Sequence, residues 1–128
     1  MSDPGWPLQQ ALFARLTDEL SVPVFDAVPM DTPYPYVTID SEQLVNSSPI
    51  SGRRRETRLL YLSVWSDYQG QAEVKQILGE MSSALDERPL AIDTGRVVSV
   101  RVQNARSNRE PDGRTYQGSM TVRIITTH

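Results

Sequence analysis

The chain has 128 residues, of which 38% are hydrophobic and 23% are charged, and its formal net charge is −3. This length accommodates one hydrophobic core, so we expect a single domain over residues 1–128, and the composition excludes a disordered chain. Because the chain contains no cysteine, a disulfide framework, a thiolate metal site and a cysteine nucleophile are all excluded.

The charge is divided unevenly along the chain. Residues 1–45 contain seven acidic residues and one basic residue, a net charge of −6, whereas residues 46–128 contain nine acidic and twelve basic residues, a net charge of +3. A nucleic-acid-binding domain usually carries a basic excess over the whole domain, and this chain does not. Two regions of opposite charge instead favour head-to-tail contact between copies.

No apolar run approaches the ~20 residues that span a bilayer, so we expect no membrane partner. Residues 1–5 lack the basic and apolar segments of a secretory signal. We therefore expect the protein to be made in the cytoplasm.

The first part of the chain predicts one helix and two strands. A leucine at every fourth position predicts a helix over 7–20. Strands are expected over 24–28 and 36–45, on either side of a proline-rich loop. Residues 46–55 lack apolar periodicity and end in three consecutive arginines, so we expect a loop that is mobile in the free subunit and ordered against a partner.

The strand predicted over 56–66 is apolar on both faces. One face carries Leu60, Leu62 and Val64, and the other carries Leu59, Tyr61 and Trp65. Such a strand needs a covering layer on each side. We expect a helix to cover the first face, and another subunit or another layer to cover the second. Leu59, Tyr61 and Trp65 are therefore the candidate subunit interface.

The remaining predicted elements complete the sheet. They are a helix over 71–86, a strand over 90–92, a strand over 96–104, a tight turn at 110–113 and a strand over 116–126. The order α-β-β-β-α-β-β-β predicts an α+β fold, in which a mostly antiparallel sheet of about five to six strands has two helices packed on one face.

The residue patterns of common enzymes are missing. The only histidine is His128, the last residue, and the seven glycines are too scattered for a phosphate-binding loop. The carboxylate pairs Asp18-Glu19 and Asp86-Glu87 end predicted helices, where solvated acids are common. We therefore predict that the chain is not an enzyme and has no catalytic, cofactor-binding or metal-binding residue.

Arginine is concentrated in one segment. The candidate partner-binding or lumen-facing loop contains Arg53, Arg54, Arg55 and Arg58. Together with Arg106, Arg109 and Arg114, these arginines are candidates for a basic rim that contacts phosphate or an acidic partner. The alternative is a solvated loop whose charges discourage pairing between sheet edges.

A second candidate contact is the tip of the last predicted hairpin. It consists of Arg109, Pro111, Asp112, Gly113 and Arg114. Asp112 and the nearby Glu110 are also conceivable calcium ligands, but Pro-Asp-Gly is the sequence that a tight turn needs. We therefore predict a turn here.

Six segments, in order along the chain, resemble one known family. They are LQQALFARL (8–16), VFDAVP (24–29), PYPYVTI (33–39), LSVWS (62–66), GQAEV (70–74) and PDGRT (111–115). The chain resembles the phage tail completion family, whose members come from siphophages, prophages and gene transfer agents. The resemblance covers nearly the whole chain, and the ordered set is more specific than any one segment.

The resemblance implies an α+β fold similar to that of siphophage tail terminators, which form hexameric rings. Such a ring caps the tail tube and joins it to the head connector, and DNA passes through it without specific binding. The implied partners are other copies of the chain, the tail tube protein and the head connector or stopper protein. The implied location is the bacterial cytoplasm during assembly and the neck of the released particle afterwards. No catalytic or cofactor residue comes with the resemblance.

Three alternatives stay open. Within the same particle, a head-to-tail connector or stopper subunit has similar dimensions. A nucleic-acid-binding module is distinguished by an affinity that falls steeply with salt. A small hydrolase would need a concave carboxylate site with perturbed ionisation.

Overall fold

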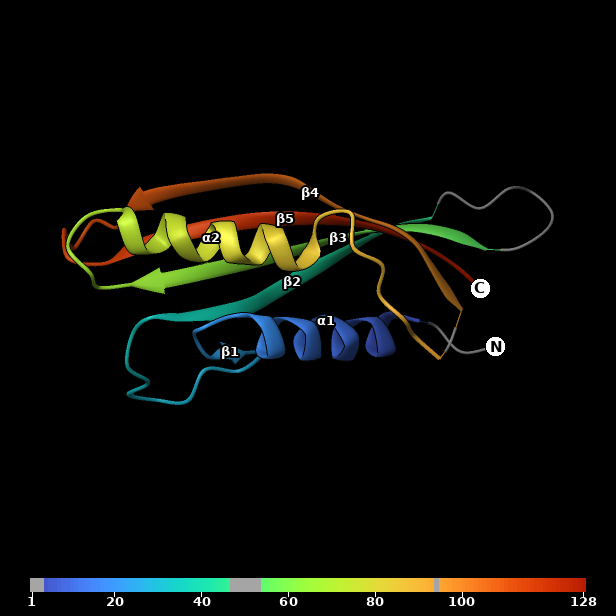
Figure 1. The fold of residues 1–128 in the computed structure, drawn as a ribbon, viewed down its shortest axis with the longest axis horizontal. Coiled ribbons are helices and arrows are strands. Elements are labelled where there is room, and N and C mark those ends of the chain that lie inside the picture. The colour runs from blue at the N-terminus through green and yellow to red at the C-terminus, as the bar shows by residue number, and fades with distance from the viewer. Residues whose placement is uncertain (1–3, 47–53, 94) are drawn as a thin grey trace.

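The computed structural model describes residues 4–46, 54–93 and 95–128. Its elements, in chain order, are α1 (Gly5–Glu19), β1 (Val24–Phe25), β2 (Tyr36–Asn46), β3 (Arg55–Ser66), α2 (Ala72–Leu85), β4 (Arg96–Arg109) and β5 (Tyr116–Thr127). The five strands form one sheet in the order β1-β2-β3-β5-β4 (Figure 1). Neighbouring strands are antiparallel except β1 and β2, which are parallel. The predicted α+β class is confirmed.

Both helices lie on the same side of the sheet. α2 packs on β3, β4 and β5, and α1 packs against α2 and β1. Figure 1 shows α2 in front of the sheet with α1 running alongside it. No helix or strand in the described part of the chain covers the opposite side of the sheet, which we call the open face.

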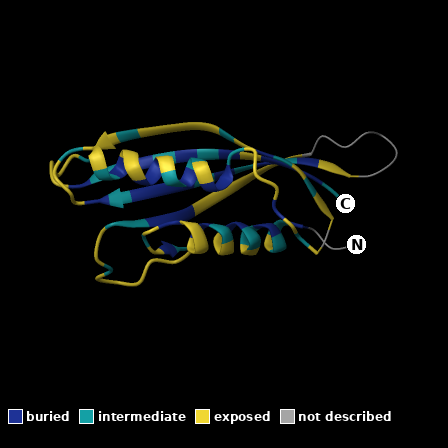
Figure 2. Ribbon diagram, in the orientation of Figure 1, coloured by how far each residue is buried: buried dark blue, intermediate teal, exposed yellow. Residues whose placement is uncertain are grey.

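A single hydrophobic core fills the space between the helices and the sheet. α1 contributes Leu8, Leu12 and Leu16, and β3 contributes Leu60, Leu62 and Val64. The four-residue spacing places the leucines on one side of α1, and the two-residue spacing places the β3 residues on one face of the strand. Figure 2 shows this burial concentrated in β3 and β5, the central strands that α2 covers.

α2 approaches β5 closely where β5 has a glycine. A Cβ atom on Gly118 would lie 2.7 Å from Cγ1 of Val74 and 3.0 Å from Cδ1 of Leu78, both on α2. Only glycine leaves room for the helix at this height of the sheet without displacing these side chains.

The segment after α2 differs from the sequence-based prediction, because the strand expected over 90–92 does not form. The backbone N–H of Glu87 donates to the carbonyl of Val100, at 2.8 Å, so the chain meets the outer edge of β4 directly after the helix. Pro89 has no N–H with which to continue a ladder. The segment is apolar because Leu90 is buried in the core although it belongs to a loop and not to a strand.

The bounds of several predicted strands also differ, and β4 continues past residue 104 to Arg109. β1 contains only Val24–Phe25, instead of 24–28, because it pairs with two residues of β2 and the chain then leaves the sheet. β2 and β3 extend into the predicted loop 46–55, to Asn46 and from Arg55. The rest of that loop, residues 47–53, lies outside the described residues, so its predicted mobility stays a prediction.

The turn predicted at 110–113 is confirmed. Asp112 Oδ1 accepts hydrogen bonds from the backbone N–H groups of Arg114 and Thr115, each at 2.8 Å. Gly113 has a φ of 72°, in the left-handed region that favours glycine. This turn joins β4 to β5 and fixes their register.

Candidate functional site

The three residues proposed as a subunit interface lie on the open face. Leu59, Tyr61 and Trp65 of β3 are each partly exposed, whereas the β3 residues between them are buried. Tyr61 donates its hydroxyl hydrogen to Oε1 of Gln43, at 3.1 Å, across the neighbouring strand. No second helical layer of the described chain covers these side chains, and their contact with another subunit stays a prediction.

The aromatic surface around Trp65 is larger than the sequence suggested. Tyr36 lies directly opposite Trp65 on β2. Its ring stacks on Tyr34, with 5.4 Å between the ring centres, and meets Phe25 edge to face at 5.9 Å. Burial, with a smaller contribution from Tyr34, raises the pKa of Tyr36 above its ordinary value of 10.0. An aromatic group therefore continues from the open face toward β1.

The centre of the open face is polar. A shallow cavity of about 390 Å³ is lined by Asp40, Tyr61, Ser63 and Arg106, among others. Asp40, at a bulge in β2, accepts hydrogen bonds from the hydroxyls of Thr38, at 2.7 Å, and Ser63. The acidic and basic side chains stand on opposite sides of this cavity, so it suits a partner surface that carries both charges.

The described residues contain neither a candidate metal site nor a candidate membrane-spanning helix. Within the described residues, no group of three or more acidic or histidine side chains is placed to hold a metal ion. None of the helices among those same residues is long and apolar enough to cross a membrane.

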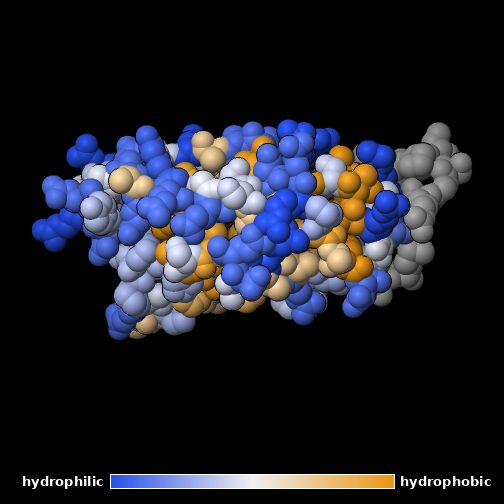
Figure 3. All heavy atoms as spheres, viewed as in Figure 1, coloured by the Kyte–Doolittle hydropathy of each residue, from blue (hydrophilic) through white to orange (hydrophobic). Residues whose placement is uncertain are grey.

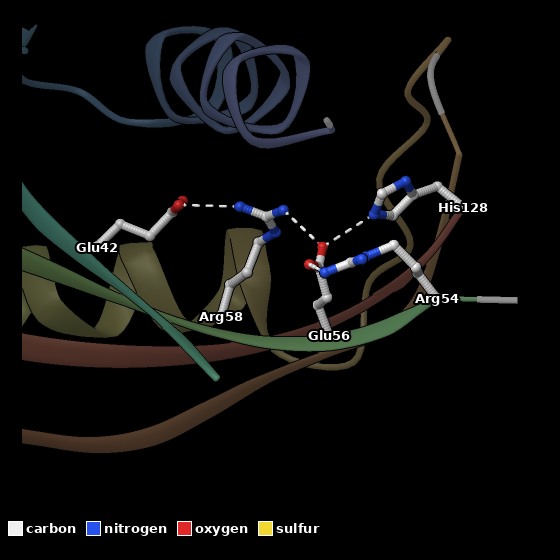
Figure 4. Close-up of polar contacts among 5 residues, drawn as sticks. All are labelled: Glu42, Arg54, Glu56, Arg58 and His128. Atoms are coloured by element: carbon white, nitrogen blue, oxygen red, sulfur yellow. Dashed lines mark hydrogen bonds and ion pairs between the residues drawn. The ribbon is translucent and has the colours of Figure 1, made fainter. Parts of the chain in front are cut away.

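Arg58 does not belong to an exposed loop, which corrects the sequence-based assignment. Its side chain is 1% exposed and lies between two carboxylates (Figure 4). Nη1 is 3.0 Å from Oε2 of Glu42, and Nη2 is 3.0 Å from Oε1 of Glu56. Strand alternation is the reason, because residue 58 has the same parity as the core residues of β3. Arg58 therefore stabilises the fold and cannot contact a partner from the surface.

The other arginines of this segment divide into two groups. Arg54 is 3.6 Å from the second carboxylate oxygen of Glu56 and is about half exposed. His128 joins the same cluster through Nε2, 3.0 Å from Oε1 of Glu56 (Figure 4). Arg55 is exposed at the start of β3, and Arg53 lies outside the described residues. Arg54 and Arg55 are thus the described residues that keep a candidate role in partner contact.

The predicted basic rim is not formed. Arg55 pairs with Thr127 at one end of β3 and β5, and Ser66 pairs with Tyr116 at the other end, next to the β4–β5 turn. Eleven residue steps of a strand separate the two ends by roughly 36 Å. The loop arginines and the hairpin arginines therefore lie at opposite ends of the sheet (Figure 1).

Asp112 at the hairpin tip has a structural explanation. The backbone N–H groups of Thr115 and Arg114, with the hydroxyl of Thr115, hold the pKa of Asp112 below its ordinary value of 3.8. All of these donors belong to the turn itself. Arg109 and Arg114 are exposed on either side of it and remain candidates for contact with a partner.

The sequence analysis missed a groove along α1. Trp6, Gln9, Gln10 and Phe13 line it on the helix, Asp26 lines it after β1, and its volume is about 400 Å³. Trp6 is 62% exposed and Phe13 is 38% exposed. Their seven-residue spacing places them on one face of a helix, which was a usable signal, but only the fold brings Asp26 beside them. Together these residues form what we call the α1 groove.

The comparisons with known proteins agree on one type of protein. No curated protein sequence matches the chain. Among solved structures, the chain is similar to a chain of the "virion of native gene transfer agent (GTA) particle", with a TM-score of 0.86, 23% sequence identity and coverage of 100% of both chains. At this identity the likeness shows a shared fold.

The family comparison goes further. The model of the family described as "Tail completion protein gp17" matches residues 10–127. This range leaves out residues 1–9, which include Trp6 and Gln9 of the α1 groove, and the last residue. It includes the open face and both ends of the sheet. The chain therefore belongs to the tail completion protein gp17 family and is a structural, non-enzymatic component of a tailed-phage-like particle.

Proposed function

We propose that copies of this chain form a ring that terminates the tail tube and joins it to the head connector. The open face is the observation that carries this proposal. Both helices lie on the other side of the sheet, so Leu59, Tyr61 and Trp65 have no covering layer within the described chain. Partly exposed apolar and aromatic side chains grouped on one face favour contact with another protein.

The helix-bearing face offers a contrast. Hydrophilic residues cover most of it, and hydrophobic residues appear there only in separate patches (Figure 3). The apolar side chains of the helices pack into the core beneath them, and their polar side chains face solvent. The open face is therefore the better candidate for the larger contact between neighbours.

The solved structure with the same fold comes from a virion of a gene transfer agent particle. By analogy, the particle that holds this chain is of the gene transfer agent or siphophage kind. The chain assembles in the bacterial cytoplasm and then occupies the neck of the particle. Its partners are other copies of itself, the tail tube protein and the head connector, and DNA passes through the ring without specific contacts.

The proposal is tested with charged substitutions on the open face. Tyr61→Glu and Leu59→Glu place a carboxylate where the neighbour is expected, and both side chains are only partly buried, so the monomer should still fold. Tyr68→Glu is the matched control, because Tyr68 is 57% exposed and lies between β3 and α2. Each purified variant is mixed with tail tubes, and capped ends are counted by negative-stain electron microscopy.

We expect the wild type and Tyr68→Glu to cap tubes, and the two open-face variants to remain folded by circular dichroism but leave the tubes uncapped. If both open-face variants cap tubes normally, the ring contact lies elsewhere. If either unfolds the monomer, the open face belongs to the core of the subunit. A wild type that neither caps tubes nor forms rings contradicts the proposed function itself.

A further inference from the structure

The two edges of the sheet carry opposite charges. Asp26 follows β1 at one edge, and Arg106 lies on β4 at the other edge. Both side chains are exposed, and neither has an ion-pair partner among the described residues. The first third of the chain is acidic and the remainder is rich in arginine. The strand order places β1, from the acidic part, at one edge of the sheet and β4, from the arginine-rich part, at the opposite edge.

The acidic edge has a shape that suits an arginine. In the α1 groove, Asp26 stands next to the aromatic side chains of Trp6 and Phe13. An arginine fits such a groove with its aliphatic stem against the rings and its guanidinium over the indole face. The carboxylate of Asp26, which lines the groove, can then accept two parallel hydrogen bonds from the guanidinium. A lysine, with its compact and strongly hydrated charge, fits less well.

The strand register places the two edges at the same height. Phe25 pairs with Thr38, Thr38 with Ser63, Ser63 with Ser119, and Ser119 with Arg106. This row crosses all five strands, and Asp26 is the residue after Phe25. In a ring whose axis runs along the strands, each edge meets the opposite edge of the next copy at equal height. Arg106 lies on the open face and Asp26 lies on the helix side, in the α1 groove, so the two meet when the open face at the β4 edge of one copy lies against the α1 side of the next.

We propose that Arg106 of one subunit inserts into the α1 groove of the next and pairs there with Asp26. The occupant of the groove is thus a second copy of this chain, and the inference rests on the proposed ring. The two partners are different surfaces of the same chain, so the contact is head to tail and does not satisfy itself in a two-fold dimer. It defines which edges of the subunit meet, in addition to the contact of the open face.

Charge reversal tests this pairing. Asp26→Arg places a basic residue at both positions, and Arg106→Glu places an acidic residue at both, so each variant alone has like charges at the proposed contact. We expect each to need at least about tenfold more protein than the wild type to form rings, because like charges facing each other at an interface are strongly disfavoured. The double variant Asp26→Arg/Arg106→Glu restores opposite charges and should recover assembly.

An equal mixture of the two single variants is a second test of the same contact. A copy with acidic residues at positions 26 and 106 can then alternate with a copy that has arginine at both, so the mixture should assemble at a concentration at which neither variant does so alone. Native mass spectrometry should find rings with equal numbers of the two chains. The control is Lys75→Glu, which reverses a basic charge at an exposed position of α2, away from both sheet edges and from the open face; it should assemble as the wild type does. Arg106→Gln, which removes the charge without reversing it, should be intermediate.

The outcomes separate this inference from the proposed function. If wild type forms rings and both single variants do so equally well, the edge contact is wrong and the ring stands. If the single variants fail but neither the double variant nor the mixture recovers, the two residues do not meet and the inference is overturned. If the wild type forms no ring, alone or on tubes, the proposed function fails and this contact fails with it.

Discussion

Glu56 and Arg58, two residues apart on β3, form an ion pair in the protein interior. Their closest atoms, Oε1 and Nη2, are 3.0 Å apart, and the side chains are 3% and 1% exposed. Both belong to the face of β3 that carries the core leucines. Glu42, Arg54 and His128 complete the cluster around them. A buried pair of this kind is costly to break from one side, because the remaining charge loses its partner.

We therefore expect Arg58→Ala to lower the free energy of unfolding by about 3 kcal/mol or more. Glu42→Ala should have a smaller effect, of about 1 kcal/mol, because Glu42 is 27% exposed and its loss leaves Arg58 paired with Glu56. Urea denaturation of the three proteins measures the difference. Equal effects of the two substitutions would mean that the buried cluster contributes no more than a surface pair.

Two glycines that differ in their surroundings provide a matched test of the contact between α2 and the sheet. Gly118→Ala should destabilise the protein by about 1–3 kcal/mol, because the new methyl group displaces side chains of α2. Gly79→Ala should stabilise it by about 0.5–1 kcal/mol, because Gly79 lies within α2 with open space around its Cα. Thermal unfolding gives the sign of each change. A destabilised Gly79→Ala or an unaffected Gly118→Ala contradicts the packing described here.

The β4–β5 turn should make a pH-dependent contribution to stability. The pKa of Asp112 is lowered in the folded chain, so its stabilising effect is present above its ordinary pKa of 3.8 and is lost as the pH falls through the lower folded value. The wild type should therefore exceed Asp112→Ala in stability at pH 7, and this difference should narrow below about pH 4.

Thermal unfolding of both proteins from neutral to acidic pH measures that difference. The pKa of Glu19 is also lowered, mainly by its hydrogen bond from Arg88, but this effect is common to both proteins and cancels. Asp112→Asn keeps a side-chain oxygen as acceptor without the charge, so it should show no such pH dependence. A difference that stays constant down to the lowest pH would exclude the carboxylate as its source.

The proposed contact between subunits can also be trapped covalently, because the chain contains no cysteine. Asp26→Cys/Arg106→Cys in one chain should give, on oxidation of assembled rings, a ladder of disulfide-linked products that ends at the number of subunits in the ring. Asp26→Cys/Lys75→Cys is the control, because Lys75 is exposed on α2 and away from both sheet edges, and it should remain uncrosslinked. Non-reducing electrophoresis distinguishes the two, and similar ladders from both would show that the disulfides form by random collision.

The sequence by itself determined the features that depend on spacing within one segment. The leucine repeat of α1, the two apolar faces of β3 and the Pro-Asp-Gly turn all follow from local periodicity or turn geometry. These were sufficient for the α+β class and for placing Leu59, Tyr61 and Trp65 on a face away from the core. Local patterns misassigned the segment 90–92, because an apolar loop packed into a core has the same composition as a short strand.

Only the tertiary structure decided how distant segments meet. The sequence pattern grouped Arg58 with a charged loop. In the structure, Arg58 belongs to β3 and its side chain is on the same face of the strand as the core residues. The arginines of one expected rim lie at opposite ends of the sheet, because β3 and β5 run antiparallel over their whole length. The strand order β1-β2-β3-β5-β4 placed Asp26 and Arg106 on opposite edges at equal height. The relative positions of these residues depend on pairing between strands that are far apart in the chain. The residue pattern within one strand does not predict that pairing.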